Sequence, residues 1–312
     1  MPITMMFAGD ELGVDYAEYA KDHRVLVEAQ IRTAKKFDFD YVSAISDPTR
    51  EAADYGSEIE WFENQPPGLS ETHSLLTDRF RLGQLPRLDT VLGGRCQDRI
   101  HAVELLRQRA GGEKLVEGWV EGPCAEAADL RGINRLMLDF SDDPEFVHSL
   151  FDWVVDNAIW FARAQTAVGA DIIGVGDAAA SLVGPRIYEE FVWPAEKKLV
   201  DGIHSAGGRV RLHICGNARR ILGGMGRLGC EMVDLDYLSP VGEAREKMGP
   251  DQVLAGNIDP VRVLLNGAPE AVTDAIASCH RQAGARYIVA AGCEVPRGTP
   301  HANLRALVEY AR

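Results

Sequence analysis

The sequence predicts an α/β protein folded as a (β/α)8 barrel with one irregularity, and three observations lead to this fold class. The 312 residues are enough to bury a large core in one such barrel. A unit recurs along the chain: a helical pattern, a turn with glycine, and a short β-branched run. Nearly every run ends in a polar residue. Strands that alternate with helices pair in parallel through right-handed crossovers.

Seven segments have the pattern of buried strands, and helix-length segments such as 143–169 and 185–207 lie between most of them. The predicted strands are FDYVSAISD (39–47), EKLVEGWVEG (113–122), GADIIGVGD (169–177), GRVRLHICG (208–216), CEMVDLD (230–236), DQVLAGN (251–257) and ARYIVAAGC (285–293). We expect one domain over residues 1–312, with a helical segment at about 1–37. An eighth strand is not evident, and residues 57–68 have the pattern of a hairpin excursion, so the barrel is expected to be irregular.

The polar strand ends separate the barrel from the other architecture that fits, a doubly wound open sheet. A barrel brings all its strand carboxyl ends to one rim, whereas an open sheet uses only the ends beside its switch point. Polar residues end nearly every predicted strand, so the barrel explains more of them. These residues are Asp47, Glu121, Asp177, His213 with Cys215, Asp234 with Asp236, Asn257 and Cys293.

Composition limits the function. A net charge of −14 with 46% hydrophobic residues is typical of a soluble acidic protein and argues against nucleic-acid binding. We find neither a signal peptide nor an apolar run long enough for a membrane helix. Six scattered cysteines indicate free thiols in a reducing compartment, and we expect a cytoplasmic protein, either a monomer or a homodimer.

His213 and Cys215 point to the same face of a strand, because side chains alternate with period two. Cys293 ends a later strand and would reach the same rim. One imidazole and two sulfurs supply three of the four positions of a tetrahedral Zn²⁺ site, and Asp177 or Asp236 is the nearest candidate for a displaceable oxygen. Two other interpretations stay open: ordinary packing of a buried histidine and cysteine, or Cys215 as a nucleophile with Cys293 as a bystander.

The chain resembles the uroporphyrinogen decarboxylase superfamily over nearly its whole length. The resemblance rests on FDYVSAISD, GWVEGP, GADIIGVGDAAASLVGPRIYEEFVWP, LHICGN, MVDLDY, VLAGNIDP and YIVAAGC. It implies a (β/α)8 barrel. The arginine-rich RQAGRY-type segment of the decarboxylases is missing near the start, and Gly292-Cys293 stands where they carry Gly-His. The chain is instead similar to the corrinoid-dependent methyltransferases, such as the methylcobamide:coenzyme M methyltransferases and related demethylases.

That branch binds zinc through H-x-C and a distant cysteine, which match His213, Cys215 and Cys293 residue by residue. The resemblance implies a zinc-dependent methyltransferase that moves a methyl group between a corrinoid (a cobalamin) on a partner protein and a thiol or small methylated substrate. The metal would favour the thiolate of an acceptor. No cobalamin-binding module is evident in this chain. The alternatives are a metal-free decarboxylase-like lyase and a barrel that binds a tetrapyrrole without turnover.

The sequence indicates the roles of the remaining polar residues at the strand ends less directly. Asp177 could be an oxygen ligand, could orient His213, or could cap the following helix. Asp47 matches the family's pocket aspartate, and a turn beside Pro48 would explain it equally well. We expect catalytic roles for Asp47, Glu121, Asp177 and Asp236, and substrate contacts for Asp234 and Asn257.

Overall fold

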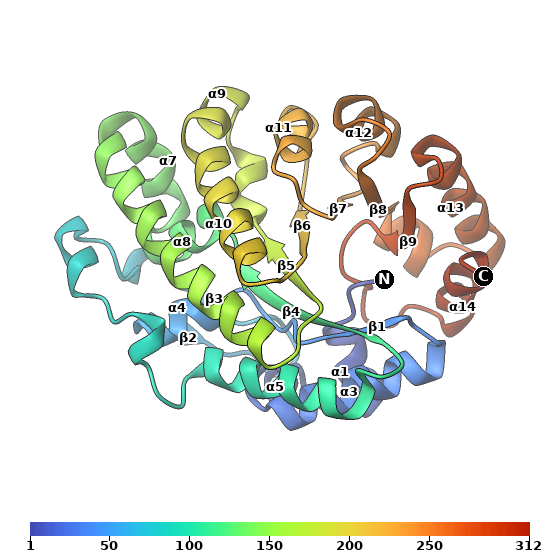
Figure 1. Ribbon diagram of the computed structural model, residues 1–312. Coiled ribbons are helices and arrows are strands. Elements are labelled where there is room, and N and C mark those ends of the chain that lie inside the picture. The colour runs from blue at the N-terminus through green and yellow to red at the C-terminus, as the bar shows by residue number, and fades with distance from the viewer.

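Seven parallel strands form a curled sheet around a central axis, with helices on the outside (Figure 1). The computed structural model describes residues 1–312. The strand order is β1-β4-β5-β6-β7-β8-β9, and every neighbouring pair is parallel. The strands are β1 (Tyr41–Ser43), β4 (Leu115–Glu121), β5 (Ile172–Gly176), β6 (Val210–Ile214), β7 (Met232–Leu235), β8 (Val253–Ile258) and β9 (Tyr287–Ala291). The predicted barrel class and all seven predicted strands are confirmed.

Helices follow most strands and cover the outer face of the sheet. They are α1 (Met6–Leu12), α2 (Tyr16–Lys21), α3 (His23–Phe37), α4 (Arg50–Tyr55), α5 (Arg95–Ala110), α6 (Pro123–Arg131), α7 (Ile133–Asp142), α8 (Pro144–Ala167), α9 (Pro185–Ile187), α10 (Trp193–Ser205), α11 (Leu222–Arg227), α12 (Val241–Met248), α13 (Pro269–Ala283) and α14 (His301–Tyr310). Short 3₁₀ segments are η1 (Glu71–His73), η2 (Arg79–Gln84), η3 (Leu88–Thr90) and η4 (Ala178–Leu182). Two π-helical turns are η5 (Tyr188–Val192) and η6 (Pro260–Leu265).

Local sequence explains why the longest helix begins where it does. Asp143 accepts a hydrogen bond from the Phe146 amide, and Pro144 occupies the first helical position, where its missing N–H is no loss. The buried face of α8 carries Val147, Leu150, Phe151, Val154, Val155, Ala158, Phe161 and Ala162, at the three- and four-residue spacing of an amphipathic helix. Burial of this face against the sheet fixes the helix on the outside of the barrel.

Residues on opposite faces of the strands fill two different spaces. Ile173 and Val175 belong to a core of 76 buried residues that extends from Phe7 to Leu307, between sheet and helices. Because side chains alternate along a strand, Ile172 faces the other way, into the ring. It packs there with Met232, Ala255 and Ala290 from β7, β8 and β9. The interior is therefore a packed floor beneath the mouth of the barrel.

The barrel has no eighth hydrogen-bonded strand, because β1 and β9 are the two edges of the sheet. Residues 1–5 occupy this gap, and the N-terminus lies inside the ring near β9 (Figure 1). The Met1 nitrogen donates to the Val289 carbonyl, and the Val295 amide donates to the Ile3 carbonyl. The predicted irregularity is confirmed, although the sequence did not indicate what fills the gap.

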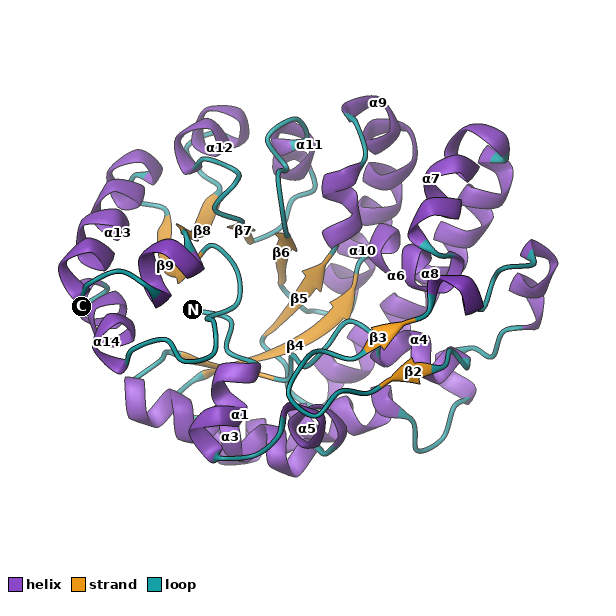
Figure 2. Cartoon of the chain, turned by 180° about the vertical axis from the view of Figure 1, so that it is seen from behind, coloured by secondary structure: helices purple, strands orange, loops and turns teal.

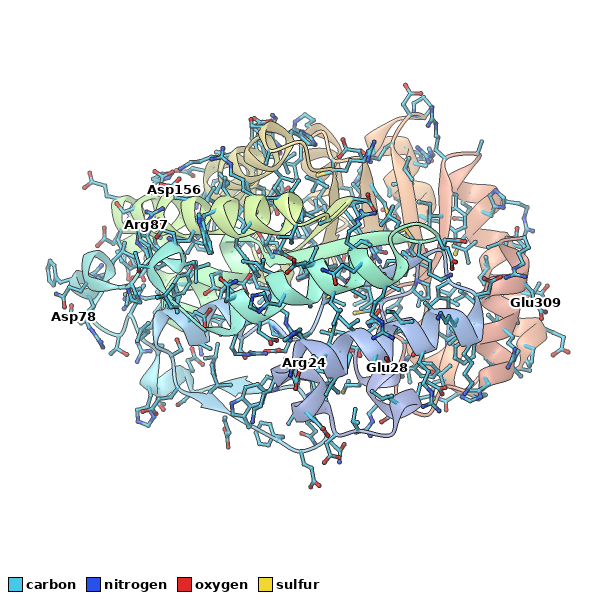
Figure 3. The ribbon with its side chains drawn as sticks, turned by 60° about the horizontal axis from the view of Figure 1, so that its bottom comes forward. Arg24, Glu28, Asp78, Arg87, Asp156 and Glu309 are labelled. Carbon is cyan, nitrogen blue, oxygen red and sulfur yellow. The ribbon has the colours of Figure 1, made fainter.

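An antiparallel hairpin of β2 (Ile59–Glu60) and β3 (Gly68–Leu69) lies to one side of the barrel (Figure 2). This position agrees with the hairpin predicted at 57–68. Charged side chains such as Arg24, Glu28 and Glu309 project from the outer helices, away from the strands (Figure 3). None of the helices has both the length and the apolar character needed to span a bilayer.

Candidate metal centre and cavity at the barrel mouth

A cavity of about 200 Å³ opens at the carboxyl ends of the strands. This end of a barrel is where barrel enzymes keep their reactive groups. Its lining consists of Ile3, Met5, Ile45, Ser46, Asp47, Pro48, Arg50, Trp119, Glu121, Gly176, Ala178, His213, Cys215, Cys293 and Glu294. The cavity is smaller than the roughly 300–1,000 Å³ of pockets for drug-sized ligands, so it suits a small molecule.

Three soft donor atoms converge on one wall of this cavity. The His213 Nε2 atom lies 2.9 Å from the Cys215 sulfur, and that sulfur lies 3.6 Å from the Cys293 sulfur. His213 is buried, whereas both cysteines are half-buried and reach the cavity. The alternation of β6 and the end of β9 thus bring together the three residues predicted to bind metal.

The ring of His213 is oriented by β7. Its Nδ1 atom lies 3.2 Å from the Asp234 carbonyl and 3.4 Å from the Asp234 carboxylate. With Nδ1 in this contact, Nε2 is left to face the sulfurs. Below the ring, Arg211 joins Asp234 to Glu117 in a fully buried layer. Burial would raise the pKa of Asp234, but Arg211 and His213 lower it to about 2, so the carboxylate stays charged.

The two cysteines share one proton between them. The hydrogen bond from Cys215 lowers the pKa of Cys293 to about 4, and the same contact, together with burial, raises the pKa of Cys215. Burial disfavours a charged His213, yet the neighbouring Cys215 and Asp234 outweigh burial and raise its pKa. These shifts in pKa favour a Cys293 thiolate beside a positively charged His213 ring.

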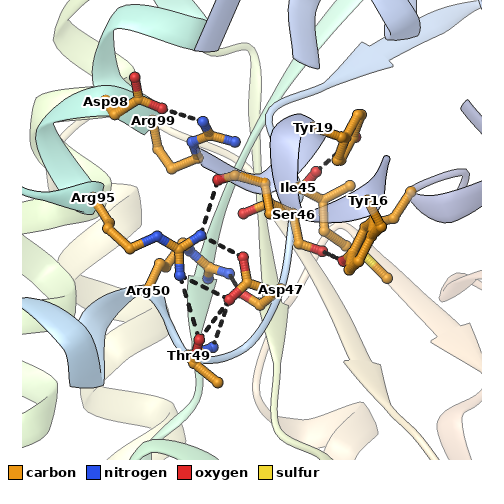
Figure 4. A network of polar contacts seen from close by, with 12 residues as sticks. Tyr16, Tyr19, Ile45, Ser46, Asp47, Thr49, Arg50, Arg95, Asp98 and Arg99 are labelled. Carbon is orange, nitrogen blue, oxygen red and sulfur yellow. Dashed lines mark hydrogen bonds and ion pairs between the residues drawn. The ribbon is translucent and has the colours of Figure 1, made fainter. Parts of the chain in front are cut away.

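A network of charges surrounds Asp47 and Arg50, which also line the cavity (Figure 4). The Arg95 guanidinium binds both carboxylate oxygens of Asp47, at 2.8 and 2.5 Å. Thr49 also donates to Asp47, at 2.7 Å. Burial alone would raise the pKa of Asp47, but Arg95 lowers it to about 2. Arg50, which is 1% exposed, donates to Glu51 and Glu121 at 3.1 and 3.0 Å.

Glu121 and Glu294 are the two cavity carboxyl groups with raised pKa values. Burial raises the pKa of Glu121 well above its usual range, and Arg50 offsets this only in part. Burial raises the pKa of Glu294 to about 7, although the Met5 and Met6 amides donate to its side chain.

The structure does not bring four of the predicted residues to the cavity lining. The Asp177 carboxylate accepts hydrogen bonds from the Cys124 and Ala125 amides, so it caps α6 and not η4. The contact of Asp177 with His213 is between backbone groups, the Asp177 amide donating to the His213 carbonyl. Asp234 is bound beneath His213, which corrects its expected substrate contact. The Asn257 amide group fixes the loop after β7 by donating to the Asp236 and Ser239 carbonyls.

Asp236 holds the same loop in shape. Its two oxygens accept hydrogen bonds from the Gly216 and Leu238 amides. Burial raises its pKa, and the charge on Cys293 adds to that increase. Of the two carboxylates considered as the oxygen ligand, Asp177 is held by α6, whereas Asp236 is held by the amide of Gly216, the residue after Cys215. At the barrel mouth, only His213, Cys215 and Cys293 have donor atoms within 4.8 Å of one another.

Sequence reasoning missed three residues that line the cavity: Arg50, Trp119 and Glu294. Trp119 lies between Glu117 and Glu121 at the spacing of one strand face, which was a usable signal. Glu294 directly follows a predicted metal ligand. Nothing local marked Arg50, because its importance comes from Glu121, 71 residues further along the chain.

The donor set was tested against the geometry that zinc requires. Zinc–sulfur bonds of about 2.3 Å in a tetrahedron place two sulfurs about 3.8 Å apart. The 3.6 Å between Cys215 and Cys293 is close to that value. An imidazole nitrogen held by a carboxylate partner, two sulfurs and a nearby carboxylate oxygen are all accepted zinc ligands. The 2.9 Å between His213 Nε2 and the Cys215 sulfur is a hydrogen-bond distance, shorter than the roughly 3.5 Å between such atoms around tetrahedral zinc. The three residues thus supply the ligand types for zinc and would move slightly apart to hold it.

The fold and the site define a parallel barrel protein with an imidazole and two sulfurs converging on a cavity at the carboxyl ends of its strands. The chain belongs to the uroporphyrinogen decarboxylase (URO-D) family, whose model matches residues 5–312.

Relatives within this family catalyse two kinds of reaction. Methylcobamide:CoM methyltransferase MtbA of Methanosarcina mazei is 32% identical over 278 residues, which cover 88% of this chain and 80% of that protein. A uroporphyrinogen decarboxylase of Crocosphaera subtropica is 29% identical over 219 residues, 67% of this chain and 61% of that protein. A solved structure of a methyltransferase from Methanosarcina mazei has the same fold, with a TM-score of 0.84 over 99% of this chain and 92% of that chain at 21% identity.

Proposed function

We propose that the protein is a zinc-dependent methyltransferase. It transfers a methyl group between a corrinoid, carried by a partner protein, and a thiol or small methylated substrate. The convergence of His213, Cys215 and Cys293 at the cavity carries this proposal. The methyltransferases among its relatives support it, MtbA being similar over 88% of this chain.

The residues of this chain would divide the work as follows. His213, Cys215 and Cys293 would hold the metal, and Asp236 would supply the displaceable oxygen. A bound zinc ion would lower the pKa of a substrate thiol and so supply a nucleophile near neutral pH. Asp234 keeps the His213 ring turned with Nε2 toward the metal position. The apolar side chains of the lining, such as Ile3 and Trp119, would exclude water from the reacting sulfur.

The methyl transfer would be a nucleophilic displacement in which sulfur replaces cobalt on the methyl carbon. A bond forms between the thiol sulfur and the methyl carbon, while the cobalt–carbon bond breaks and leaves its electron pair on cobalt. The thiol proton passes to a base, for which Glu294 is the candidate among the three carboxyl groups of the cavity, because Asp47 is bound by Arg95 and burial keeps Glu121 protonated. The demethylase direction reverses these bonds. In either direction the partner must bring the corrinoid to the mouth of the barrel.

The experiment that tests this function measures metal content and methyl transfer together. Wild-type protein purified without added metal is analysed for zinc, alongside Cys293→Ala and a matched control, Cys230→Ala. Cys230 is buried outside the candidate metal centre, so its loss tests for general damage. We expect about one zinc per chain in the wild type and the control. Cys293→Ala should lose most of the metal and the transfer of methyl from methylcobalamin to a thiol.

Two results would contradict the proposal. Wild-type protein that binds no zinc even when zinc is supplied would favour a metal-free, decarboxylase-like lyase, as would undiminished turnover in Cys293→Ala. Loss of zinc from the Cys230→Ala control would mean that the metal is bound elsewhere or that the variants are misfolded.

A further inference from the structure

We propose that the cavity selects substrates without a negative charge: a neutral or cationic small thiol, or a neutral or cationic methylated compound in the reverse direction. A substrate with a sulfonate or carboxylate tail is rejected. This inference rests on the proposed function, since it concerns the substrate of the same site. The observation behind it is that no cation in or beside the cavity is free.

The cavity lining contains more acidic side chains than basic ones. Three carboxyl groups, those of Asp47, Glu121 and Glu294, face one guanidinium, that of Arg50. Apart from Ser46 and the three candidate metal ligands, the rest of the lining is apolar. An anionic tail in such a space would lose its hydration without gaining a counter-charge, which is a large cost for a buried charge.

Arg50 is already neutralised by the protein. Its Nη2 atom donates to Glu51 and Glu121, its Nε atom lies 3.1 Å from Glu51, and its Nη1 atom donates to the Asp47 carbonyl. The side chain is 1% exposed. An anion that displaced one of these partners would leave a buried carboxylate without its cation.

Arg95, the next nearest guanidinium, is likewise occupied (Figure 4). Both of its terminal nitrogens bind Asp47, and they also donate to Thr49 and to the Ala20 carbonyl. Trp61 of the hairpin covers it, with 4.9 Å between the guanidinium carbon and the ring centroid. Arg95 therefore holds Asp47 in place and is not available to a ligand.

Glu294 has the opposite property, a carboxyl group without a cation. The Met5 and Met6 amides donate to it, at 3.2 and 2.7 Å, and no ion pair reaches it. Ionised, it repels an anion and attracts an ammonium; protonated, it still offers no positive charge. The argument for selection thus holds in either protonation state.

The metal would not supply the missing positive charge. Two thiolates and a neutral imidazole would cancel the two charges of a divalent ion, and either the Asp236 carboxylate or an entering thiolate in the fourth position would make the site negative. Trp119, which also lines the cavity, presents an aromatic ring that attracts ammonium and sulfonium groups. A cationic or neutral tail is therefore the better match.

The test uses three thiols with the same HS–CH₂–CH₂ group and different tails: 2-aminoethanethiol, 2-mercaptoethanol and 2-mercaptoethanesulfonate. Dissociation constants are measured by calorimetry on zinc-loaded protein and on protein stripped of metal, and are corrected for each thiol's own pKa. The sulfonate should bind at least roughly tenfold more weakly than the other two.

Variants show whether the cavity carboxyl groups cause the selection. Asp47→Asn should narrow the ratio between the sulfonate and amine dissociation constants at least about threefold, since it removes a charged carboxylate from the lining and leaves the Arg95 guanidinium without its carboxylate partner. The control is Glu309→Gln, because Glu309 lies on the outer face of α14 (Figure 3) and should leave the ratio unchanged. Comparing this ratio of dissociation constants between variant and wild type removes the differences in chemistry between the thiols themselves.

The outcomes separate this inference from the proposed function. Zinc-dependent binding in which the sulfonate is the tightest ligand, or equal to the others, overturns the selection and leaves the methyltransferase intact. Binding of all three thiols that ignores zinc overturns the proposed function, and the selection falls with it. The wild-type series alone decides both points if a variant fails to fold.

Discussion

Asp234 lies beneath the candidate metal centre, where its carboxylate connects His213 to the buried Arg211. We expect Asp234→Asn to weaken zinc binding by roughly tenfold to a hundredfold, the usual effect of losing a carboxylate that orients a ligating histidine. A zinc competition titration against a chromophoric chelator measures this. Asp201→Asn, on the exposed side of α10, is the control. Unchanged affinity in Asp234→Asn would mean that the Asp234 carbonyl alone orients the ring.

Gly174 of β5 makes room for the Trp119 ring that lines the cavity. A Cβ atom at Gly174 would lie 2.0 Å from the ring, so the ring would have to move. We expect Gly174→Ala to lower the free energy of unfolding by about 1–3 kcal/mol, as overpacking does. Urea unfolding measures this, with Gly184→Ala as control, because a Cβ atom there meets nothing within 4 Å. Equal stability of the two variants would contradict this prediction.

Helices α4 and α6 bury more acid than base. Arg50 of α4 pairs with Glu51 and with Glu121 of β4, whereas Glu126 of α6 has no ion pair and neither of its oxygens has a hydrogen-bond partner. Burial raises the pKa of Glu126 well above its usual range, and Glu51 and Asp129 raise it further. In the folded protein Glu126 thus stays protonated at a pH where the unfolded chain has released the proton.

The sign of the pH effect follows from this shift. Protonated Glu126 makes its full contribution to the free energy of unfolding below about pH 4, the pKa of this group in the unfolded chain. That contribution is lost as the pH rises toward the higher pKa of the folded state. We expect Glu126→Gln, which cannot ionise, to be more stable than the wild type by about 1 kcal/mol or more at pH 7.5 and by less at pH 5. Urea unfolding at both values measures this, with the exposed Glu104→Gln of α5 as control. A constant difference between the two pH values would argue against a buried acid.

At the scale of elements, the sequence predicted the strands better than the contacts between them. Alternating and β-branched runs located all seven strands, because burial on both sheet faces is encoded locally. The rim positions of His213, Cys215 and Cys293 followed from period-two geometry. The partner of Asp177 did not, because α6 begins more than fifty residues earlier and only the fold brings them together. Ion pairs such as Arg50 with Glu121 are equally invisible to local patterns.

On the scale of the whole molecule, apolar side chains are exposed around the mouth of the barrel. They are Leu182 after β5, Tyr237 and Leu238 after β7, and Val261 after β8, with exposed fractions of 66, 41, 44 and 54%. A partner that presents a corrinoid to the cavity must cover these loops. Exposed apolar groups of this kind are typical of protein contacts.

If these exposed apolar residues bind the partner, a charge placed among them should slow methyl transfer only when the partner protein supplies the corrinoid. We expect Leu238→Glu to lower the methyl-transfer rate with a methylated corrinoid protein by roughly tenfold or more, since a charge would be buried on docking. The rate with free methylcobalamin should stay unchanged. Phe80→Glu is the control, because Phe80 is 89% exposed next to Asp78 at the periphery (Figure 3). Equal losses with both methyl donors would place the effect in the cavity and not at a docking surface.

The segment of residues 1–5 that fills the gap between β1 and β9 has a consequence for the order of folding. The contacts of Met1 with Val289 and of Met5 with Glu294 join residues 288 and 289 positions apart, which are among the slowest contacts for a chain to form. The strand just before Cys293 pairs with β8, its neighbour in sequence, just as the strand of His213 pairs with β5 and β7. The three donor residues can therefore meet before residues 1–5 close the gap, and this late closure completes the cavity by adding Ile3 and Met5 to its lining.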